Sequence, residues 1–373
     1  MIPIEEIAEA FNRTYRNVIK HGGKIPSVLK DVQYLARIIK LGEERRLQNS
    51  DRLGIPVPRF CIFSVTWDCN LECIGCYASR YSSKGTLTVE DIKRIASEAS
   101  DLGSFAFIIA GGEPFLVPDL VQILSSIKKS LFFVFTNGTR IDEQSIKLLN
   151  RSKNIVPVVS IEGESDFTDY RRGSGVSEQV LATMKKMTDQ NIGFGFSSMA
   201  THANVKFVTS RDWFDQMWTY GARFGFIIDY IPQDADSDLS LTLTDEDMEY
   251  KKKELEARNM EARPAVVNFP PDEYNGQSCQ SAGRGLIHIN ADGFVEPCPF
   301  SHYARDNVKD KSLIEILASE FFTDIRDRFE HEPFKKSCML TEHKEVMDYL
   351  AGKHQAFKTD MISIPTCTDG KCL

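Results

Sequence analysis

The sequence predicts an α/β fold in which six strand–helix units form a partial parallel barrel, with helices before it and a small domain after it. From residue 60 onward, short apolar runs alternate with segments of helical period, which is the pattern of parallel strands joined by crossover helices. The runs are apolar at nearly every position, as expected for a sheet that helices cover. Six units are too few for a closed eight-fold barrel, so we expect a partial (β/α)6 barrel of the TIM type.

The apolar runs predict strands at residues 60–66, 105–110, 131–136, 156–161, 193–199 and 224–231. Between them, apolar residues recur with a period near 3.6, which predicts helices at residues 89–102, 120–129, 144–150, 177–189 and 211–220. In such folds the reactive groups gather at the carboxyl ends of the strands. Functional residues are therefore expected where these runs end.

Composition limits both the partners and the compartment. The chain has 373 residues, 42% of them apolar, and is long enough for two or three domains. Its 45 basic and 53 acidic residues give a net charge of −8, which disfavours nucleic acid, since that partner requires clustered positive charge. No apolar run approaches the ~20 residues that span a bilayer, and the first residues lack the basic and apolar regions of a signal peptide. We therefore expect a cytoplasmic protein with no transmembrane segment.

Five regions are expected along the chain. They are an N-terminal helical segment at 1–57, the barrel at 58–232, a linker with a helix at 233–277, a small cysteine-bearing domain at 278–345 and a tail at 346–373.

Three cysteines, Cys69, Cys73 and Cys76, follow the first predicted strand with the spacing C-x3-C-x2-C. Thiolates hold iron–sulfur clusters, and three thiolates on a 4Fe-4S cluster leave one iron open to a ligand that is not protein. Zinc is the weaker interpretation because it requires four ligands, usually in two pairs. Disulfides require an oxidising compartment. Cysteines that only pack are common, but three within eight residues favour a cluster.

The next three strands also end in polar or glycine-rich residues. The second ends at Gly111-Gly112-Glu113-Pro114, where two glycines let the backbone approach a ligand and a carboxylate can accept hydrogen bonds from an amine. The third ends at Thr136-Asn137, and the fourth at Ser160-Ile161-Glu162. One Gly-Gly turn is weak evidence, but together with the cysteine loop these make four such strand ends, which predict one shared site.

These motifs resemble the radical S-adenosylmethionine (radical SAM) superfamily over roughly residues 60–232. The resemblance implies that Cys69, Cys73 and Cys76 ligate a 4Fe-4S cluster, whose fourth iron the amino and carboxylate groups of S-adenosylmethionine chelate. It implies reductive cleavage of that cofactor to a 5′-deoxyadenosyl radical, with an electron donor such as flavodoxin or ferredoxin. The residues implied to contact the cofactor are Gly111, Gly112, Glu113, Pro114, Thr136, Asn137, Ser160, Glu162, Arg172 and Tyr77.

Two of these residues have an alternative interpretation, and one position departs from the family. Glu162 is equally consistent with a solvated surface acid, and Arg172 with a structural ion pair. The residue before the third cysteine is often aromatic in the family and packs on the adenine, whereas here it is Gly75, and Tyr77 follows the cysteine instead.

Five further cysteines fall late in the chain. Residues 286–293 alternate and end in Asp-Gly, which predicts a hairpin flanked by Cys279 and Cys298. This stretch resembles the SPASM and twitch extensions of radical SAM proteins, which hold auxiliary iron–sulfur clusters. The resemblance implies one auxiliary 4Fe-4S cluster with Cys279, Cys298 and Cys338 as ligands, and the fourth ligand stays open between Cys367, Cys372, water and the substrate. Packing alone is the alternative for these cysteines, and His288 is interpreted as simply hydrogen-bonded.

Amphipathic helices are expected at residues 4–20 and 28–46. Packing against the barrel is favoured for them over contact with a membrane surface, which basic amphipathic helices also make. No strand pattern occurs there, so the leader-binding domain of many peptide-modifying relatives is not expected.

The leading hypothesis is a radical SAM enzyme, an oxidoreductase or bond-forming enzyme, that abstracts hydrogen from an unactivated C–H bond of a peptide or other organic substrate. The same chemistry on a lipid or small molecule is the first alternative. A non-catalytic iron–sulfur protein for electron transfer or sensing is the second. The motif at residues 111–114 argues against it, because a sensor needs no pocket for an amino group.

Overall fold

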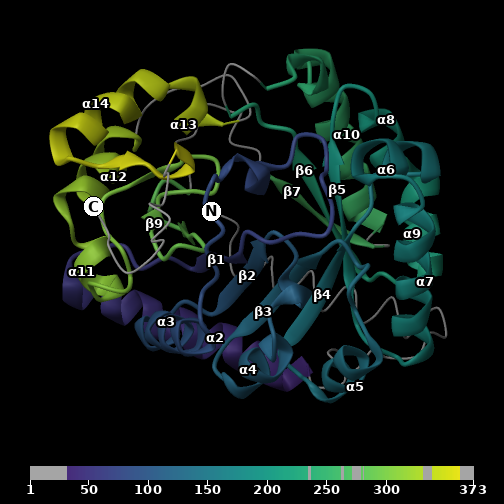
Figure 1. Ribbon diagram of the computed structural model, residues 1–373, viewed down its shortest axis with the longest axis horizontal. Coiled ribbons are helices and arrows are strands. Elements are labelled where there is room, and N and C mark those ends of the chain that lie inside the picture. The colour runs from purple at the N-terminus through teal and green to yellow at the C-terminus, as the bar shows by residue number, and fades with distance from the viewer. Residues whose placement is uncertain are drawn as a thin grey trace, which may run out of the picture.

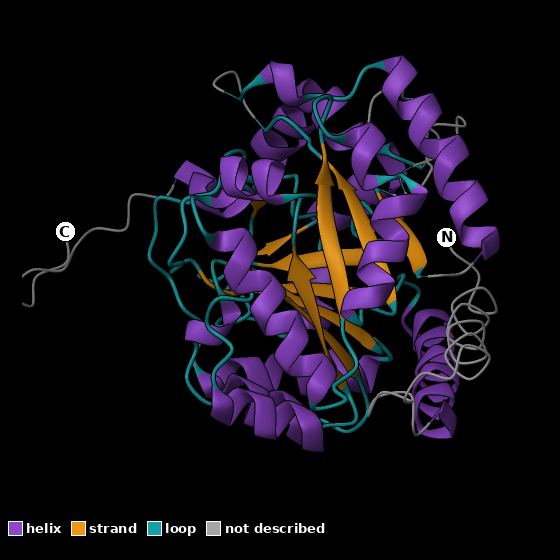
Figure 2. Ribbon diagram, turned by 90° about the vertical axis from the view of Figure 1, so that its right-hand side faces the viewer, coloured by secondary structure: helices purple, strands orange, loops and turns teal. Residues whose placement is uncertain are grey.

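A nine-stranded sheet organises the molecule, with the order β7-β6-β5-β4-β3-β2-β1-β8-β9. The computed structural model describes residues 32–233, 237–261, 264–270, 279, 281–330 and 338–361. Helices lie around the outside of the curved sheet (Figure 1, Figure 2). The sheet therefore has the covered, barrel-like form that the alternating sequence pattern predicts.

All six predicted strands are present, and each pairs in parallel with the next. They are β1 (Phe60–Thr66), β2 (Ala106–Gly111), β3 (Leu131–Thr136), β4 (Ile155–Ser160), β5 (Gly195–Ala200) and β6 (Phe224–Asp229). The predicted partial parallel barrel is confirmed. Because the strands are parallel, their carboxyl ends meet at one edge of the sheet.

Three further strands extend this sheet. β7 (Ala265–Phe269) pairs in parallel with β6, so the expected linker contains a barrel strand in addition to its helix, α10 (Asp245–Glu261). β8 (Leu286–Ile289) pairs in parallel with β1, and β9 (Val295–Glu296) pairs antiparallel with β8. The predicted hairpin is present, and its first strand is part of the barrel sheet.

The five predicted helices are also present. They are α3 (Val89–Leu102), α4 (Leu120–Ser126), α5 (Glu143–Arg151), α7 (Val176–Asp189) and α9 (Arg211–Tyr220). Two short helices, α6 (Ser165–Arg172) and α8 (Val205–Val208), and the 3-10 turns η2 (Tyr77–Arg80) and η3 (Pro114–Leu116) have no counterpart among the predictions. Each is at most eight residues long, too short to show an apolar period.

The helix α2 (Val32–Leu53) packs against the amino ends of the strands. Its Leu35, Ile38 and Ile39 are buried in one cluster with Phe105 and Leu131, which lie at the starts of β2 and β3. This apolar stripe is therefore used inside the protein, as the packing interpretation predicts. The helix expected at residues 4–20 lies outside the described residues.

The C-terminal part adds a small helical domain beside the hairpin. It comprises β10 (Tyr303–Ala304), α11 (Leu313–Leu317), α12 (Glu320–Arg328), α13 (Met339–Glu342), α14 (Lys344–His354) and β11 (Phe357–Lys358). Figure 1 shows these helices gathered near β9, across the molecule from α6, α7 and α9. The structure differs here from the expected tail at 346–373, because residue 346 lies inside α14, whose Met347 and Leu350 are buried. None of the helices within the described ranges is long and apolar enough to cross a membrane.

Candidate functional site

A cavity of about 250 Å³ lies at the carboxyl ends of β1 to β7. Ten of the residues predicted to bind the cluster or the cofactor line it: Cys69, Cys73, Cys76, Tyr77, Gly111, Gly112, Thr136, Asn137, Ser160 and Arg172. Glu113, Pro114 and Glu162 are not part of the lining. The fold therefore brings the cysteine loop and the ends of three neighbouring strands to one space, with two predicted carboxylates outside it.

The two glycines at the end of β2 hold the start of the cysteine loop. The backbone N–H of Gly112 donates to the carbonyl of Thr66 (2.7 Å), and the N–H of Glu113 donates to the carbonyl of Asp68 (2.8 Å). A Cβ on Gly112 would lie 2.0 Å from that Asp68 oxygen, and one on Gly111, whose φ is 114°, would lie 2.4 Å from the Thr66 oxygen. Only glycine permits this approach, so these residues fix the path of the loop as it leaves β1.

The Glu113 carboxylate joins β2 to β3. It is 0% exposed and accepts hydrogen bonds from Thr136 Oγ1 (2.7 Å), the Asn137 N–H (2.7 Å) and the Phe115 N–H (3.0 Å). Burial raises the pKa of Glu113, although these hydrogen bonds oppose the shift. The predicted contact of this side chain with an amino group of the cofactor stays a prediction, and in the structure its oxygens bond to protein groups.

The three loop cysteines have the character of cluster ligands. Cys69 is exposed and Cys73 and Cys76 are half-buried, and burial raises the pKa of the Cys73 thiol. Asn137 Nδ2 lies 3.8 Å from the Cys69 sulfur, and Arg172 Nη1 lies 4.0 Å from the Cys73 sulfur. Across the described part of the chain, no three His, Cys, Asp or Glu side chains form a site for a single metal ion. In a cluster each thiolate binds its own iron, so three sulfurs that face one cavity fit that group.

The structure explains why residue 75 is glycine, where the family often has an aromatic residue. Its φ is 69°, in the left-handed region that favours glycine, and a Cβ there would lie 2.7 Å from the ring of Tyr230. Tyr230 also lines the cavity. An aromatic ring from the end of β6 therefore occupies the space beside the position where the family often carries an aromatic residue.

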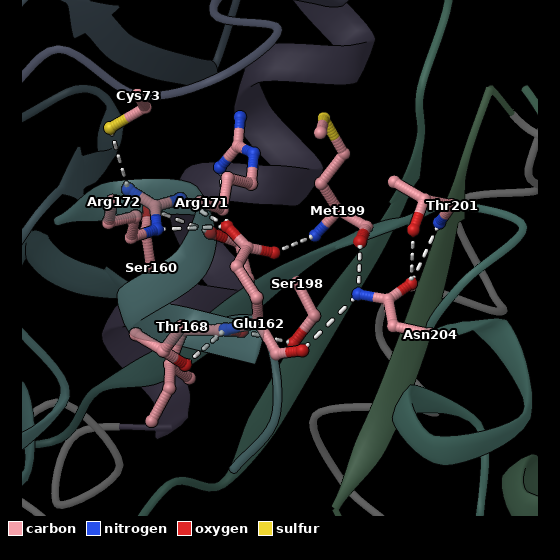
Figure 3. A network of polar contacts seen from close by, with 12 residues as sticks. Cys73, Ser160, Glu162, Thr168, Arg171, Arg172, Ser198, Met199, Thr201 and Asn204 are labelled. Atoms are coloured by element: carbon pink, nitrogen blue, oxygen red, sulfur yellow. Dashed lines mark hydrogen bonds and ion pairs between the residues drawn. The ribbon is translucent and has the colours of Figure 1, made fainter. Parts of the chain in front are cut away.

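Glu162 is the centre of a buried ion-pair network (Figure 3). Its side chain is 1% exposed and accepts from Arg171 Nη1 (2.5 Å), Arg172 Nη2 (2.5 Å) and the Met199 N–H (2.6 Å). Burial alone would raise the pKa of Glu162, but the charges of Arg171 and Arg172 hold it below its ordinary value. The structure thus excludes the interpretation of Glu162 as a solvated surface acid. Arg172 forms an ion pair with Glu162 and also lines the cavity, so its predicted contact with the cofactor stays a prediction.

Arg171 and Asp229 line the cavity but were not among the predicted residues. Arg171 adjoins Arg172 at the end of α6, and this neighbour was the one feature of the sequence that could have identified it as a site residue. Asp229 ends β6 and forms an ion pair with Lys251 of α10, both side chains being fully buried. Lys251 also donates to Asn268 of β7 (2.9 Å). Asp229 follows an apolar run, as the other site residues do, and this position could have identified it from the sequence.

The three late cysteines within the described residues are buried. Cys279, before β8, is 5% exposed, Cys298, after β9, is 4% exposed, and Cys338, before α13, is 8% exposed. Next to Cys298, the buried Ser301 Oγ and His302 Nδ1 have no hydrogen-bond partner within the described residues. Thiols beside unsatisfied polar atoms fit an iron–sulfur cluster, whose sulfurs accept hydrogen bonds. Cys367 and Cys372 lie outside the described residues.

Two family models match the chain. Residues 63–204 match the Radical SAM superfamily, and residues 279–339 match SPASM, an iron–sulfur cluster-binding domain. The first range contains the three-cysteine loop and the strand-end residues, and the second contains all three late cysteines of the structure. The two matches therefore cover the two cysteine groups separately.

Similar proteins are known by sequence and by structure. The AdoMet-dependent heme synthase of Methanosarcina barkeri is 24% identical over 318 residues, which cover 78% of this chain and 90% of that protein. The subtilosin biosynthesis protein AlbA of Bacillus subtilis is 26% identical over 320 residues, covering 81% and 70%. The structure of Streptococcus suis SuiB bound to S-adenosylmethionine superposes with a TM-score of 0.63 at 16% identity, covering 75% of this chain and 70% of SuiB. SuiB has also been solved with its precursor peptide SuiA, with a TM-score of 0.62 and 15% identity, covering 78% and 69%.

Proposed function

Because the chain belongs to the radical SAM superfamily and is an enzyme with a C-terminal SPASM domain, we propose that it abstracts a hydrogen atom from an unactivated C–H bond of a peptide substrate. The radical SAM domain implies a 4Fe-4S cluster and S-adenosylmethionine, and the SPASM domain implies auxiliary iron–sulfur chemistry. When bound and reduced, the cluster and S-adenosylmethionine supply a 5′-deoxyadenosyl radical. What the chain itself contributes is the binding, orientation and enclosure of the reacting groups.

One observation carries this proposal: the three cysteine sulfurs and the ends of β2, β3 and β4 line the same cavity. Cys69, Cys73 and Cys76 would hold the cluster. The backbone at Gly111 and Gly112, with Thr136, Asn137, Ser160 and Tyr77, would form the wall that the cofactor contacts.

Arg172 would meet the carboxylate of the cofactor. Its guanidinium lines the cavity, is near the Cys73 sulfur and is oriented by Glu162. Glu162 and Glu113 would then act indirectly, because their oxygens are bonded to the groups that face the cavity. Such orientation by bonded neighbours is the usual way in which binding groups are held in place.

The auxiliary cluster would be held by Cys279, Cys298 and Cys338. Pro299 and Phe300, which directly follow Cys298, line the cavity, and the Phe300 ring lies 5.9 Å from that of Phe269 at the end of β7. The auxiliary site is therefore connected to the cavity by two residues. This placement suits a cluster that accepts an electron or holds the substrate.

A peptide is the first choice of substrate because of the relatives. AlbA is named for the biosynthesis of a bacteriocin, and SuiB binds a precursor peptide. A flavodoxin or ferredoxin is the proposed electron donor, and the cytoplasm, where thiols stay reduced, is the proposed compartment.

A small molecule is the second candidate substrate. The match to the AdoMet-dependent heme synthase favours it, since it extends over 90% of that protein. In this case the same residues would bind the cluster and cofactor, and only the substrate would differ.

The test is reductive cleavage of S-adenosylmethionine under anaerobic conditions. The reconstituted protein, incubated with dithionite and S-adenosylmethionine, should release 5′-deoxyadenosine, measured by liquid chromatography. Cys69→Ala should abolish the product. Cys61→Ala is the matched control, because Cys61 is a buried cysteine of β1 that bonds Ser104 and does not line the cavity, and it should retain the product.

Two results would contradict the proposal: no 5′-deoxyadenosine from the wild type with or without candidate substrates, or full product from Cys69→Ala. The substrate is tested separately. Small peptides encoded beside the gene and a tetrapyrrole are added in parallel, and mass spectrometry shows which of them changes in mass. A change in the mass of the tetrapyrrole alone would show that the substrate is a small molecule, the second candidate.

A further inference from the structure

A buried chain of hydrogen bonds links the cavity wall to the SPASM hairpin, β8 and β9. The Tyr77 hydroxyl lies 3.0 Å from Ser64 Oγ, Ser64 Oγ lies 2.7 Å from His288 Nε2, and His288 Nδ1 lies 2.6 Å from Glu296 Oε2. Ser64, His288 and Glu296 are all 0% exposed. The four residues come from η2, β1, β8 and β9, so the chain crosses from the cysteine loop through the barrel sheet into the C-terminal domain.

Glu296 is the fixed end of this chain. Besides His288, its carboxylate accepts from Tyr81 (2.9 Å), Asn290 Nδ2 (2.8 Å) and Thr359 Oγ1 (2.6 Å). A buried carboxylate that accepts four hydrogen bonds from different elements is held firmly, since moving it would leave those donors unsatisfied.

The hydrogen bonds have a defined direction at the carboxylate end. Both Glu296 oxygens accept hydrogen bonds from Tyr81, Asn290 and Thr359, as the oxygens of a carboxylate do. The carboxylate therefore only accepts, and His288 Nδ1 must donate to it. Nε2 then accepts from the Ser64 hydroxyl when the ring is neutral and donates to it when the ring is charged. In both cases Ser64 bridges His288 and Tyr77, so the link does not depend on the charge of the ring.

At its other end the chain holds the Tyr77 hydroxyl, which forms a hydrogen bond with Ser64 Oγ. Tyr77 lines the cavity, and because its hydroxyl bonds Ser64, we take the aromatic ring as the part that faces a ligand and the hydroxyl as its anchor. The ring position is then set from within the SPASM hairpin, 219 residues along the chain at Glu296.

We propose that Ser64 and His288 are positioning residues that transmit the fixed location of Glu296 to Tyr77, and that they thereby shape the wall against which S-adenosylmethionine binds. The inference rests on the proposed function, because it takes Tyr77 to be a cofactor contact. It adds that the SPASM hairpin acts on the cofactor pocket of the radical SAM domain through these side chains, separately from any cluster that the C-terminal domain holds.

The test compares variants that cut the chain with one that does not. Ser64→Ala and Tyr77→Phe each remove one hydroxyl of the chain and leave the Tyr77 ring or its aromatic equivalent in place. Thr359→Val is the matched control, because it removes one hydrogen bond from the Glu296 carboxylate and leaves its bonds to His288, Tyr81 and Asn290 in place. The reconstituted proteins are titrated with S-adenosylmethionine by anaerobic calorimetry without a reductant, so that no cleavage occurs, and their melting temperatures are recorded.

Ser64→Ala and Tyr77→Phe should each weaken binding about five- to tenfold, the effect of one lost hydrogen bond, whereas Thr359→Val should stay within about twofold of the wild type. The double variant Ser64→Ala/Tyr77→Phe should bind like either single variant, because both cut the same link. The electron paramagnetic resonance spectrum of the reduced cluster should also respond differently to S-adenosylmethionine in the chain variants.

Several outcomes would overturn the inference. Equal weakening by Thr359→Val would show that the loss of affinity does not come from cutting the link between Tyr77 and His288. Unchanged affinity in Ser64→Ala or Tyr77→Phe would show that the chain of hydrogen bonds does not act on the pocket. Additive losses in the double variant would mean that the Tyr77 hydroxyl contacts the ligand itself. If Ser64→Ala fails to fold, Tyr77→Phe against Thr359→Val decides. If the wild type binds no S-adenosylmethionine, the proposed function is refuted as well. If the wild type binds it and the variants are unaffected, only the role of the hydrogen bonds is refuted.

Discussion

Replacing Glu162 with Gln should destabilise the protein far more than an ordinary surface substitution. Glu162 is 1% exposed and neutralises two guanidiniums that are themselves only 13% and 11% exposed. In Glu162→Gln the two arginines keep their charge in a buried place, and the new amide NH₂ group faces donors. Breaking a buried ion pair by removing one partner costs about 3–5 kcal/mol. We expect about 3 kcal/mol, the lower end, because both arginines retain some contact with water.

The assay is unfolding by urea and by heat, without cluster or cofactor. A loss of this size should lower the melting temperature by roughly 4 °C, given the unfolding entropy of a chain of 373 residues. Asp189→Asn is the control, since Asp189 pairs with Lys185 at 2.8 Å with both side chains largely exposed (73% and 58%), and exposed pairs contribute less than about 1 kcal/mol. An equal loss of stability in Glu162→Gln and Asp189→Asn would refute the argument that burial makes the Glu162 ion pairs costly to break.

The pH dependence provides a second check on Glu162. Its pKa in the folded protein lies below the ordinary value of 4.5, so its contribution is fully present above that value and is lost as the pH falls through the lowered folded-state pKa. The stability difference between wild type and Glu162→Gln should therefore be constant near neutral pH and shrink below about pH 4.5. If the stability difference between wild type and Glu162→Gln grew on acidification, the pKa of Glu162 would be raised in the folded protein, contrary to this prediction.

Three further predictions concern the metal sites and the cavity. Cys69→Ala and Cys298→Ala should each lose one cluster, about four irons per chain, by Mössbauer iron counts, and full retention would contradict the ligand assignment. Gly112→Ala, whose Cβ would lie 2.0 Å from a backbone oxygen of the cysteine loop, should lose the loop cluster, whereas Gly352→Ala in α14, where nothing lies within 4 Å, should keep it. Asp229→Asn removes the carboxylate that faces the fully buried ammonium group of Lys251, which would keep its hydrogen bond to Asn268. The variant should lower stability by about 3 kcal/mol, and an unchanged urea midpoint would contradict this prediction.

The barrel was predictable because its strands carry a strong local signal. The apolar runs at 60–66 and 131–136 coincide with β1 and β3, since a strand covered on both faces needs apolar residues throughout. β7 was not predicted, because its five residues between Pro264 and Pro270 are short and follow a charged segment. The burial of Lys251 could not be predicted at all, since nothing in the pattern of α10 distinguishes it from its exposed neighbours.

The residue types of the site were predictable, but the roles of its carboxylates were not. Position at a strand end placed Glu113 and Glu162 correctly near the cavity, yet both bond to protein groups contributed by other parts of the chain. The direction in which such a side chain points depends on which donors the fold brings to it, and these come from elements 24 and 37 residues away. The glycine at residue 75 could not be explained from the sequence either, because the ring that it approaches, that of Tyr230, lies far along the sequence.

The pairing of β1 with β8 bears on how this protein is made. Residues Phe60 to Phe63 of β1 find their partners at Leu286 to Ile289, so one edge of the first strand stays open on the ribosome until the last quarter of the chain has emerged. Contacts this distant in sequence form slowly, and an unpaired apolar strand edge invites aggregation. A fragment ending near residue 232 would keep that edge permanently. We therefore expect it to be insoluble, and addition of a separately expressed C-terminal fragment during refolding to restore solubility.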